Sequence, residues 1–419
     1  MTSQTIDCGK LDGRLSVPAS KSLTHRYFIQ AALSGNPVTI YKPLKSEDAH
    51  ITLTALQKMG YDAADYDDHV VFSGKRIPVS SCSFWVENSG TSARLLSGVM
   101  ALQSFPCEMD GSARMRERPM QTLIDALQKL GATVEHHNGY LPLKTSGGNL
   151  SGRLLEVDAS KSSQFLSSIL LIAPYLDGEL KLLYGENLAS ASYLTMTVEL
   201  MKRAGVEVSE ISGGFIVKGG SGYSIADTTV EGDFSSASYF LTGAALSGGK
   251  VSISNVTADS LQGDAVITEV LRQAGAEVQW HDSGVTVTGT GRIHAVDVDV
   301  RSVPDLAPTI AVLALFADGM SRLRHVDHLR YKECDRLAAV IENISRLGGK
   351  AYAEDNQLII EPRPLKGALL ASYNDHRMAM CFALAGLRVP GVVIENRECV
   401  IKSYPGYWED FHHLHQAKT

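Results

Sequence analysis

The sequence of 419 residues has few of the features that mark a secreted, membrane-spanning or metal-binding protein. Its six cysteines include no C-x-x-C pair, which argues against a zinc site or a dithiol redox motif. The first residues carry no basic stretch followed by an apolar run, so we expect no signal peptide. The apolar stretch 310–317 is far shorter than the roughly 20 residues that cross a bilayer. These absences predict a cytoplasmic protein with reduced thiols and no membrane association.

Motifs that hold nucleotides or catalytic metals are absent as well. The sequence has no G-x-x-x-x-G-K-[ST] phosphate loop, no G-x-G-x-x-G at a strand-to-helix turn and no H-E-x-x-H, so we expect no metal site. A net charge of −7 and a pI of about 6.0 argue against nucleic-acid binding. The composition is that of a folded protein, and the length predicts two or three domains.

What the sequence does contain is an internal repeat of about 70 residues. One recurring unit is an amphipathic helix that ends in a glycine and is followed by a strand. Glycine is favoured there because it adopts positive φ without a steric penalty. The closing glycines are Gly60, Gly131, Gly205, Gly275 and Gly348. A second, interleaved unit is a mostly apolar helix with a polar first turn, and its six copies start at Ser20, Ser89, Ser162, Ser235, Asp305 and Asp375.

Each copy predicts the order strand, helix, strand, helix, strand, strand, and therefore an α/β protein. In the second copy the strands are expected at 83–88, 106–111, 132–137 and 139–145, with helices starting at Ser89 and Met120. The last two strands are close enough in sequence to form a hairpin. The first helix of each copy is nearly all apolar and must be buried on all sides, so we expect these helices at the centre and the sheets around them.

Cations lie close to several of these polar helix starts, where they oppose the helix dipole. Lys21 and Arg26 belong to the first apolar helix, Arg94 to the second and Arg377 to the last. N-capping explains the serines and aspartates. The cations have two explanations: solvated surface charge, or an anion bound at the helix start.

Two further cationic segments, 114–118 and 330–336, and the loop residue Lys402 have the same two explanations. Taken together, so many clustered cations in an acidic chain predict a small ligand with several negative charges. Phosphates and carboxylates fit, because charge-assisted hydrogen bonds of roughly 1.5–3 kcal/mol each add up on them.

In their order along the chain, these motifs resemble the EPSP synthase (5-enolpyruvylshikimate-3-phosphate synthase) family over essentially the whole sequence. The resemblance rests on segments 18–22, 88–91 with Arg94, 114–119, 162–165, 231–240, 304–305, 332–336 and 373–378, and on Lys402. It implies two domains, each with three β-α-β-α-β-β repeats packed around buried parallel helices, an inside-out α/β barrel. One domain would span 20–228 and the other 1–19 plus 229–419, with the active site in the cleft between them.

The resemblance also implies a reaction of the shikimate pathway, which leads to chorismate and the aromatic amino acids. The enolpyruvyl (1-carboxyvinyl) group of phosphoenolpyruvate moves to the 5-hydroxyl of shikimate 3-phosphate by addition and elimination, and phosphate leaves. Proton removal and proton donation are general acid–base work. The expected partners are these two small molecules, without metal, redox cofactor or nucleic acid, and the expected state is a monomer.

By the same resemblance, Asp305 would be the base, Glu333 the proton donor, and Lys21 would contact both substrates. Asp305 could also be an N-cap, and Glu333 could pair with Arg330 or Arg336. Shikimate 3-phosphate would be bound by Lys21, Ser22, Arg26, Ser162, Ser163, Gln164, Ser190, Asp305 and Lys332, with Tyr193 in support. Phosphoenolpyruvate would be bound by Lys21, Gly90, Arg118, Gln164, Arg336, Arg377 and Lys402.

Three positions depart from the family pattern: His25 and His328 stand where relatives often carry Asn, and Leu95 where many have Pro. Gly90 is kept, and we therefore expect sensitivity to glyphosate, a mimic of phosphoenolpyruvate.

Two alternatives differ in function. A sister enzyme transfers enolpyruvyl to UDP-N-acetylglucosamine and usually uses a loop cysteine; Cys107 lies in a comparable stretch but is expected in a buried strand. A non-catalytic anion-binding relative is disfavoured by the presence of Lys21, Asp305 and Glu333.

Overall fold

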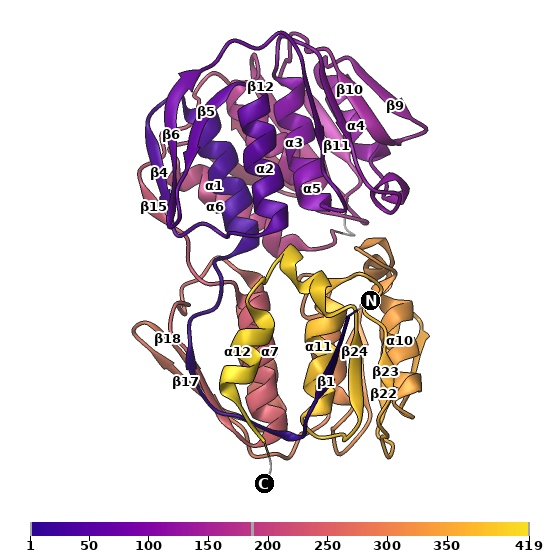
Figure 1. The fold of residues 1–419 in the computed structure, drawn as a ribbon. Coiled ribbons are helices and arrows are strands. Elements are labelled where there is room, and N and C mark those ends of the chain that lie inside the picture. The colour runs from indigo at the N-terminus through magenta and orange to yellow at the C-terminus, as the bar shows by residue number, and fades with distance from the viewer. Residues whose placement is uncertain (1, 186–187, 418–419) are drawn as a thin grey trace. The chain divides into compact units, whose positions relative to one another are not determined.

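The computed structural model describes residues 2–185 and 188–417 of a chain that divides into two compact units (Figure 1). One unit is Ala19–Val230, and the other combines Met1–Pro18 with Glu231–Thr419. The sequence prediction was 20–228 for the first domain and 1–19 with 229–419 for the second.

The described residues of the unit Ala19–Val230 form helices at the centre and three four-stranded sheets around them (Figure 1). The helices are α1 (Lys21–Ser34), α2 (Glu47–Lys58), α3 (Gly90–Ala101), α4 (Gln121–Leu130), α5 (Gln164–Ile172) and α6 (Ala191–Arg203), with short 3-10 turns η1 (Met115–Glu117) and η2 (Ala173–Tyr175). The strands are β4 (Val38–Tyr41), β5 (Tyr61–Asp65), β6 (His69–Arg76), β7 (Cys82–Trp85), β8 (Cys107–Asp110), β9 (Val134–His137), β10 (Tyr140–Thr145), β11 (Leu154–Val157), β12 (Glu179–Tyr184), β13 (Val208–Ile211), β14 (Gly214–Lys218) and β15 (Thr228–Thr229). The sheet orders are β15-β4-β6-β5, β7-β8-β10-β9 and β11-β12-β14-β13.

The other unit has the same kind of architecture, with two four-stranded sheets, β17-β18-β16-β3 and β19-β20-β22-β21, and smaller sheets β1-β24-β23 and β2-β25. Its helices are α7 (Phe234–Ser247), α8 (Ile267–Gln273), α9 (Ala307–Ala314), α10 (Arg336–Arg346), α11 (His376–Gly386) and α12 (Tyr407–Leu414), with turns η3 (Gly263–Val266), η4 (Asp327–Tyr331) and η5 (Arg397–Lys402). Its strands are β1 (Ser3–Ile6), β2 (Gly9–Leu11), β3 (Gly13–Leu15), β16 (Lys250–Ile253), β17 (Glu277–His281), β18 (Gly284–Thr288), β19 (Asp297–Asp299), β20 (Ser321–Arg324), β21 (Lys350–Glu354), β22 (Gln357–Glu361), β23 (Leu369–Leu370), β24 (Val392–Glu395) and β25 (His415–Ala417).

The predicted order of elements is confirmed in the second copy, where β7, α3, β8, α4, β9 and β10 follow one another. The first two strands, β7 and β8, are parallel, and the last two, β9 and β10, form the predicted antiparallel hairpin. All six apolar helices begin within two residues of the predicted positions. The five repeat glycines have φ between 80° and 112°, as expected for residues that end a helix in the left-handed region.

The apolar helices form the core of each unit. Every residue of α9 is buried, and so is every residue of α11. Within one unit α3 packs against α5, and within the other α9 packs against α11. A helix without a polar face is stable only when it is covered on all sides, so the sheets lie outside. Each is a separate open sheet rather than part of one continuous closed barrel.

Two short strands complete sheets of distant copies. β15 pairs with β4 and so supplies the first strand of the first copy. β3 pairs with β16 and so supplies the first strand of the fourth copy. The sixth copy differs from the predicted order. Its sheet is completed by β1, which pairs antiparallel with β24, and the chain after β24 forms η5, α12 and the single strand β25, which pairs with β2 in place of the predicted hairpin. The buried face of α12 is aromatic and apolar and consists of Tyr407, Trp408, Phe411 and Leu414.

Across the described part of the chain, we find no helix with both the length and the apolarity needed to span a bilayer.

Candidate active site

The predicted site residues fall into two groups, one in each unit. Both groups include residues at or near the N-terminal ends of helices, where free backbone N–H groups and the helix dipole favour negative charge.

Arg336 is the centre of the group in the unit that contains Glu231–Thr419. It is the first residue of α10, its side chain is 1% exposed, and it forms ion pairs with three carboxylates. Nη1 donates to Asp305 at 2.7 Å, Nη2 to Glu333 at 2.6 Å and Nε to Asp375 at 2.7 Å. Burial disfavours the charge, but the three carboxylates outweigh burial and hold the pKa of Arg336 well above its usual range.

Asp305 accepts from two arginines at once. Oδ1 is bound by Arg336, and Oδ2 accepts from Nη2 of Arg377 at 2.7 Å. Burial alone would raise the pKa of this carboxyl; Arg377, Arg336 and Lys332 together hold it well below the usual range. Asp305 is therefore ionised at neutral pH. The residue that precedes α9 is Leu306, and no side chain caps this helix, so N-capping does not account for Asp305.

Arg377 is held by the first turn of its own helix and by a buried tyrosine. The Asp375 side chain caps α11 by accepting from the Arg377 backbone N–H at 2.9 Å. Nη1 of Arg377 donates to the hydroxyl of Tyr239 at 3.1 Å, and burial raises the pKa of that tyrosine. The first turn of α11 thus presents a cation that is fixed in place.

Three more buried or half-buried residues belong to the same unit. Lys332 is half-buried and acts electrostatically on Asp305, and Lys402, the last residue of η5, is buried. His328 in η4 is also buried. Burial and the charge of Lys332 lower the pKa of His328 to about 3, so the imidazole is neutral and can donate a hydrogen bond.

The second group, in the unit Ala19–Val230, is built around α1. Lys21 in its first turn pairs with Asp48 of α2 at 3.2 Å, and both side chains are nearly buried. Arg26, one turn later, is 2% exposed and donates to Thr197 at 2.8 Å and to the carbonyls of Ser22 and Tyr193 at 2.9 and 3.0 Å. These bonds tie Ser22 and Tyr193 to one cation whose pKa burial lowers to about 10.

Gln164 and Ser162 lie at the start of α5 beside Arg94 of α3. Nη1 of Arg94 donates to the amide oxygen of Gln164 at 2.8 Å and to the Ser162 hydroxyl at 3.4 Å. The Ser163 hydroxyl donates to the carbonyl of Ser190 at 2.9 Å. Ser190 has a positive φ of 59°, and its own buried hydroxyl has no hydrogen-bond partner within residues 2–185 and 188–417.

Gly90 and Arg118 are in direct contact. Arg118 donates to the Asn88 carbonyl at 3.0 Å, just before α3, which places its guanidinium against Gly90. A Cβ on Gly90 would lie 2.4 Å from Nη2 of Arg118. A glycine is therefore required for the guanidinium to remain where it is.

His25, one of the departures from the family pattern, is fully buried and hydrogen-bonds Thr52 at 2.8 Å. Burial, with smaller contributions from Lys21 and Arg26, lowers its pKa to about 3 against the opposing charge of Asp48. The ring is neutral, and its hydrogen bond to Thr52 links α1 to α2.

Several residues that hold the predicted site together were not predicted: Asp48, Asn88, Asp264 and Asp375. Asn88 and Asp375 had a sequence signal, because they belong to the motifs at 88–91 and 373–378. Asp264 in η3 accepts from the Ser235 hydroxyl. Burial and the neighbouring Asp305 raise its pKa to about 7, although Arg377 acts in the opposite direction.

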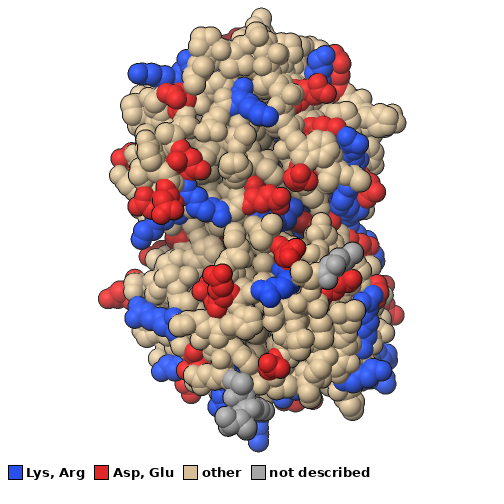
Figure 2. Space-filling model, viewed as in Figure 1, with Lys and Arg blue, Asp and Glu red and all other residues tan. Residues whose placement is uncertain are grey.

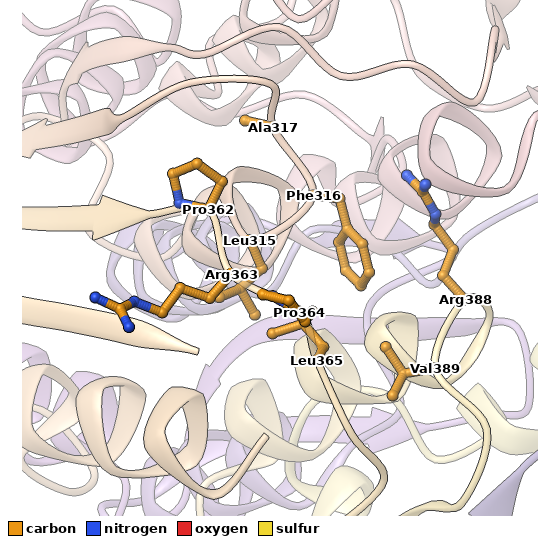
Figure 3. Close-up of a pocket in the computed structure, with 9 residues that line it drawn as sticks. All are labelled: Leu315, Phe316, Ala317, Pro362, Arg363, Pro364, Leu365, Arg388 and Val389. Carbon is orange, nitrogen blue, oxygen red and sulfur yellow. The ribbon is translucent and has the colours of Figure 1, made fainter. Parts of the chain in front are cut away.

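The predicted residues do not line the cavity of about 480 Å³ shown in Figure 3. That cavity is formed by residues 315–317, 362–365 and 388–389, with Phe316 facing into it. On the face drawn in Figure 2, Lys and Arg alternate with Asp and Glu across both units, so no cationic stripe is seen there. The clustered cations described above are mainly buried. Among the residues that the structure describes, no group of His, Cys, Asp and Glu has the arrangement of a metal site.

Comparisons with known proteins agree with one another. Residues 7–411 match the family model described as EPSP synthase (3-phosphoshikimate 1-carboxyvinyltransferase). The 3-phosphoshikimate 1-carboxyvinyltransferase of Syntrophobacter fumaroxidans is 40% identical over 96% of this chain and 97% of its own. The protein of that name from Escherichia coli strain SMS-3-5 is 37% identical over 100% and 99%.

A solved EPSP synthase from Acinetobacter baumannii superimposes with a TM-score of 0.84 at 26% identity, over 100% of this chain and 99% of that one. The α/β fold predicted from the repeats is thereby confirmed. The chain belongs to the EPSP synthase (3-phosphoshikimate 1-carboxyvinyltransferase) family.

Proposed function

We propose that this protein transfers the enolpyruvyl group of phosphoenolpyruvate to the 5-hydroxyl of shikimate 3-phosphate and releases phosphate, as a step of the shikimate pathway. The observation that carries the proposal is the cluster of Asp305, Glu333, Arg336 and Arg377. It combines an ionised carboxylate, a second carboxylate and two buried guanidinium groups, which are the groups needed for proton transfer and for anion binding.

Asp305 is the base in this proposal. Its ionised carboxylate removes the proton of the 5-hydroxyl as the oxygen attacks C2 of phosphoenolpyruvate. Glu333 takes up a proton when a substrate anion replaces it on Arg336, and this protonated carboxyl donates to the vinyl carbon. The tetrahedral adduct then loses phosphate and one proton, which restores the double bond. Each proton transfer contributes about 10²–10⁴-fold to the rate.

Cations of the two groups bind the phosphates and carboxylates. For shikimate 3-phosphate we propose Lys21, Ser22, Arg26, Ser162, Ser163, Gln164, Ser190, Asp305 and Lys332, with Tyr193 holding Arg26. Two features of Ser190 support its assignment: a left-handed backbone and a buried hydroxyl without a partner among the residues that the structure describes. Such strain and such orphaned polar groups concentrate at ligand sites. For phosphoenolpyruvate we propose Lys21, Gly90, Arg118, Gln164, Arg336, Arg377 and Lys402.

Arg336 and Arg377 are ion-paired with carboxylates of the protein itself. The phosphate and carboxylate of phosphoenolpyruvate would compete with these carboxylates for the guanidinium groups. A ligand that draws Arg377 away from Asp305 would make that carboxylate a stronger base, since the cation that lowers its pKa would move.

We further propose that the two compact units are the two domains of the family fold and that both groups of residues act on one substrate pair. The protein would work as a cytoplasmic monomer without metal or redox cofactor. The chemistry supports the absence of a metal or redox cofactor, because the addition–elimination requires only acid–base groups and anion-binding cations.

The transfer to UDP-N-acetylglucosamine has less support. Cys107, the residue comparable to the loop cysteine of that sister enzyme, lies fully buried in β8.

Phosphate release in EDTA-containing buffer tests the proposal. The purified protein is mixed with phosphoenolpyruvate and either shikimate 3-phosphate or UDP-N-acetylglucosamine. We expect release with shikimate 3-phosphate only. Release with UDP-N-acetylglucosamine only, or loss of all turnover in Cys107→Ser, would favour the sister enzyme. Binding of both substrates without release would favour a non-catalytic relative.

A further inference from the structure

Cys82 and Cys107 lie opposite each other at the first positions of the parallel strands β7 and β8. Their Sγ atoms are 3.1 Å apart. The Cys82 backbone N–H donates to the Pro106 carbonyl at 3.0 Å and fixes the start of β7 against β8. Neighbouring strands are spaced about 4.7–4.9 Å apart, which lies within the Cα separation of about 4.4–6.8 Å that disulfides require. The backbone therefore needs no large shift for the two sulfur atoms to bond.

The two thiols differ in exposure. β7 is the edge strand of its sheet and Cys82 is half-buried, whereas Cys107 is fully buried. The Cys82 thiol donates to Cys107, whose own thiol can donate to the Phe105 carbonyl at 3.8 Å. When Cys82 is ionised, the Cys107 thiol can donate to it instead.

That hydrogen bond lowers the pKa of Cys82 and raises the pKa of Cys107, and Lys58 further favours the Cys82 thiolate. The accessible sulfur is thus the more nucleophilic one, and the buried sulfur is placed to react with it next.

We propose that Cys82 and Cys107 are a modification site, at which hydrogen peroxide forms a reversible disulfide between β7 and β8. The Cys82 thiolate attacks one peroxide oxygen, the O–O bond breaks, and hydroxide leaves, so that Cys82 becomes a sulfenic acid. Cys107 sulfur then attacks Cys82 sulfur, the S–O bond breaks, and the departing hydroxide takes the Cys107 proton as water. Two thiols are oxidised and one peroxide is reduced. A small thiol such as glutathione reverses the reaction by thiol–disulfide exchange.

The disulfide would link the edge strand β7 covalently to β8, the one strand with which β7 pairs in the described part of the chain. It would also close a loop that contains the whole of α3 and so restrict the unfolded chain. A loop of about 25 residues is long enough for a clear stabilisation, and we expect the thermal midpoint to rise by roughly 5 °C or more. The inference does not depend on the proposed catalytic activity.

The test uses the full-length protein, first fully reduced and then treated with hydrogen peroxide. Free thiols are counted, and peptides are mapped by mass spectrometry without reduction. We expect two of the six thiols to be lost, a peptide cross-linked between Cys82 and Cys107, the higher thermal midpoint, and full recovery with dithiothreitol.

Matched variants separate the two roles. Cys82→Ser should leave Cys107 reduced, and Cys107→Ser should leave a Cys82 sulfenic acid that dimedone traps. Cys399→Ser is the control and should form the disulfide like the wild type. Oxidation of Cys82 in the wild type without a cross-link to Cys107, equal reaction of all cysteines, or no thiol loss would overturn the proposal.

Discussion

Arg377 donates from Nη2 to Oδ2 of Asp305 at 2.7 Å, and both residues stand at the starts of apolar helices in consecutive repeats. The repeat thus brings an anion that precedes one apolar helix and a cation in the first turn of the next into one ion pair. Arg336 binds the other oxygen of the same carboxylate. The carboxylate is therefore oriented on both sides and kept ionised, as a base that must receive a proton requires.

Asp305→Asn tests the assigned base. The amide can still accept a hydrogen bond but cannot take the proton of the 5-hydroxyl, so we expect kcat to fall about 10²–10⁴-fold with a smaller change in KM. Steady-state phosphate release measures both constants. Asp282→Asn, at an exposed turn, serves as the control and should match the wild type. Turnover of Asp305→Asn above one tenth of the wild-type rate would remove Asp305 from this role.

Arg336→Gln should destabilise the protein as well as inactivate it. The substitution leaves Asp305, Glu333 and Asp375 without the buried cation that they share. Breaking a buried ion pair by removing one partner costs about 3–5 kcal/mol. Denaturant unfolding measures this loss, and the exposed Arg322→Gln is the matched control. An Arg336→Gln variant as stable as the control would contradict the account of this cluster.

Gly90→Ala should weaken phosphoenolpyruvate binding. The added methyl group would meet the guanidinium of Arg118 at 2.4 Å, and this flexible end can move while the helix stays intact. We expect the KM for phosphoenolpyruvate to rise about tenfold, the value for one lost charge-assisted contact. Inhibition by glyphosate should weaken in parallel, with the thermal midpoint unchanged. If the variant keeps the wild-type KM, Arg118 does not bind this substrate. A wild-type rate unaffected by millimolar glyphosate would contradict the expected sensitivity.

Asp264→Asn should change how stability depends on pH. In the unfolded chain this carboxyl has its ordinary pKa of 3.8, whereas burial and Asp305 raise the folded value to about 7. The folded state therefore holds the extra proton between these values. The resulting stability is fully present below about pH 4 and is lost as pH rises through 7.

An asparagine carries no proton to lose at this position. We therefore expect Asp264→Asn to be more stable than the wild type above pH 7, by roughly 2–4 kcal/mol, and the difference to vanish near pH 4. Urea unfolding from pH 4 to pH 8 measures this difference. Parallel curves for the two proteins would show that Asp264 is already ionised in the folded state.

Much of the fold was predictable because its signals are local and repeated. Helix-ending glycines and apolar helices recur at one spacing, and the elements of the second copy occur as predicted. The completion of the sixth sheet by β1 was not predictable, since a strand of four residues carries no signal for a partner near the other end of the chain.

The candidate site, like the fold, was predictable only in part. Asp305, Glu333, Arg336 and Arg377 belong to sequence motifs, and the structure brings these four residues into one cluster. The residues that hold the site in place were not predictable. Asp48 meets Lys21 only because α2 packs beside α1, and the backbone and side-chain oxygens of Asn88 accept from Arg118 only because segments 30 residues apart come together.

The most direct test of the proposed reaction is the structure of its product. The protein is incubated with shikimate 3-phosphate and phosphoenolpyruvate labelled with ¹³C at C2, and the product is examined by NMR and mass spectrometry. The account predicts a labelled enol ether carbon attached to the 5-oxygen of shikimate 3-phosphate, in equal amount to the phosphate released. Labelled pyruvate with unchanged shikimate 3-phosphate would contradict it, because the protein would then hydrolyse phosphoenolpyruvate rather than transfer its enolpyruvyl group.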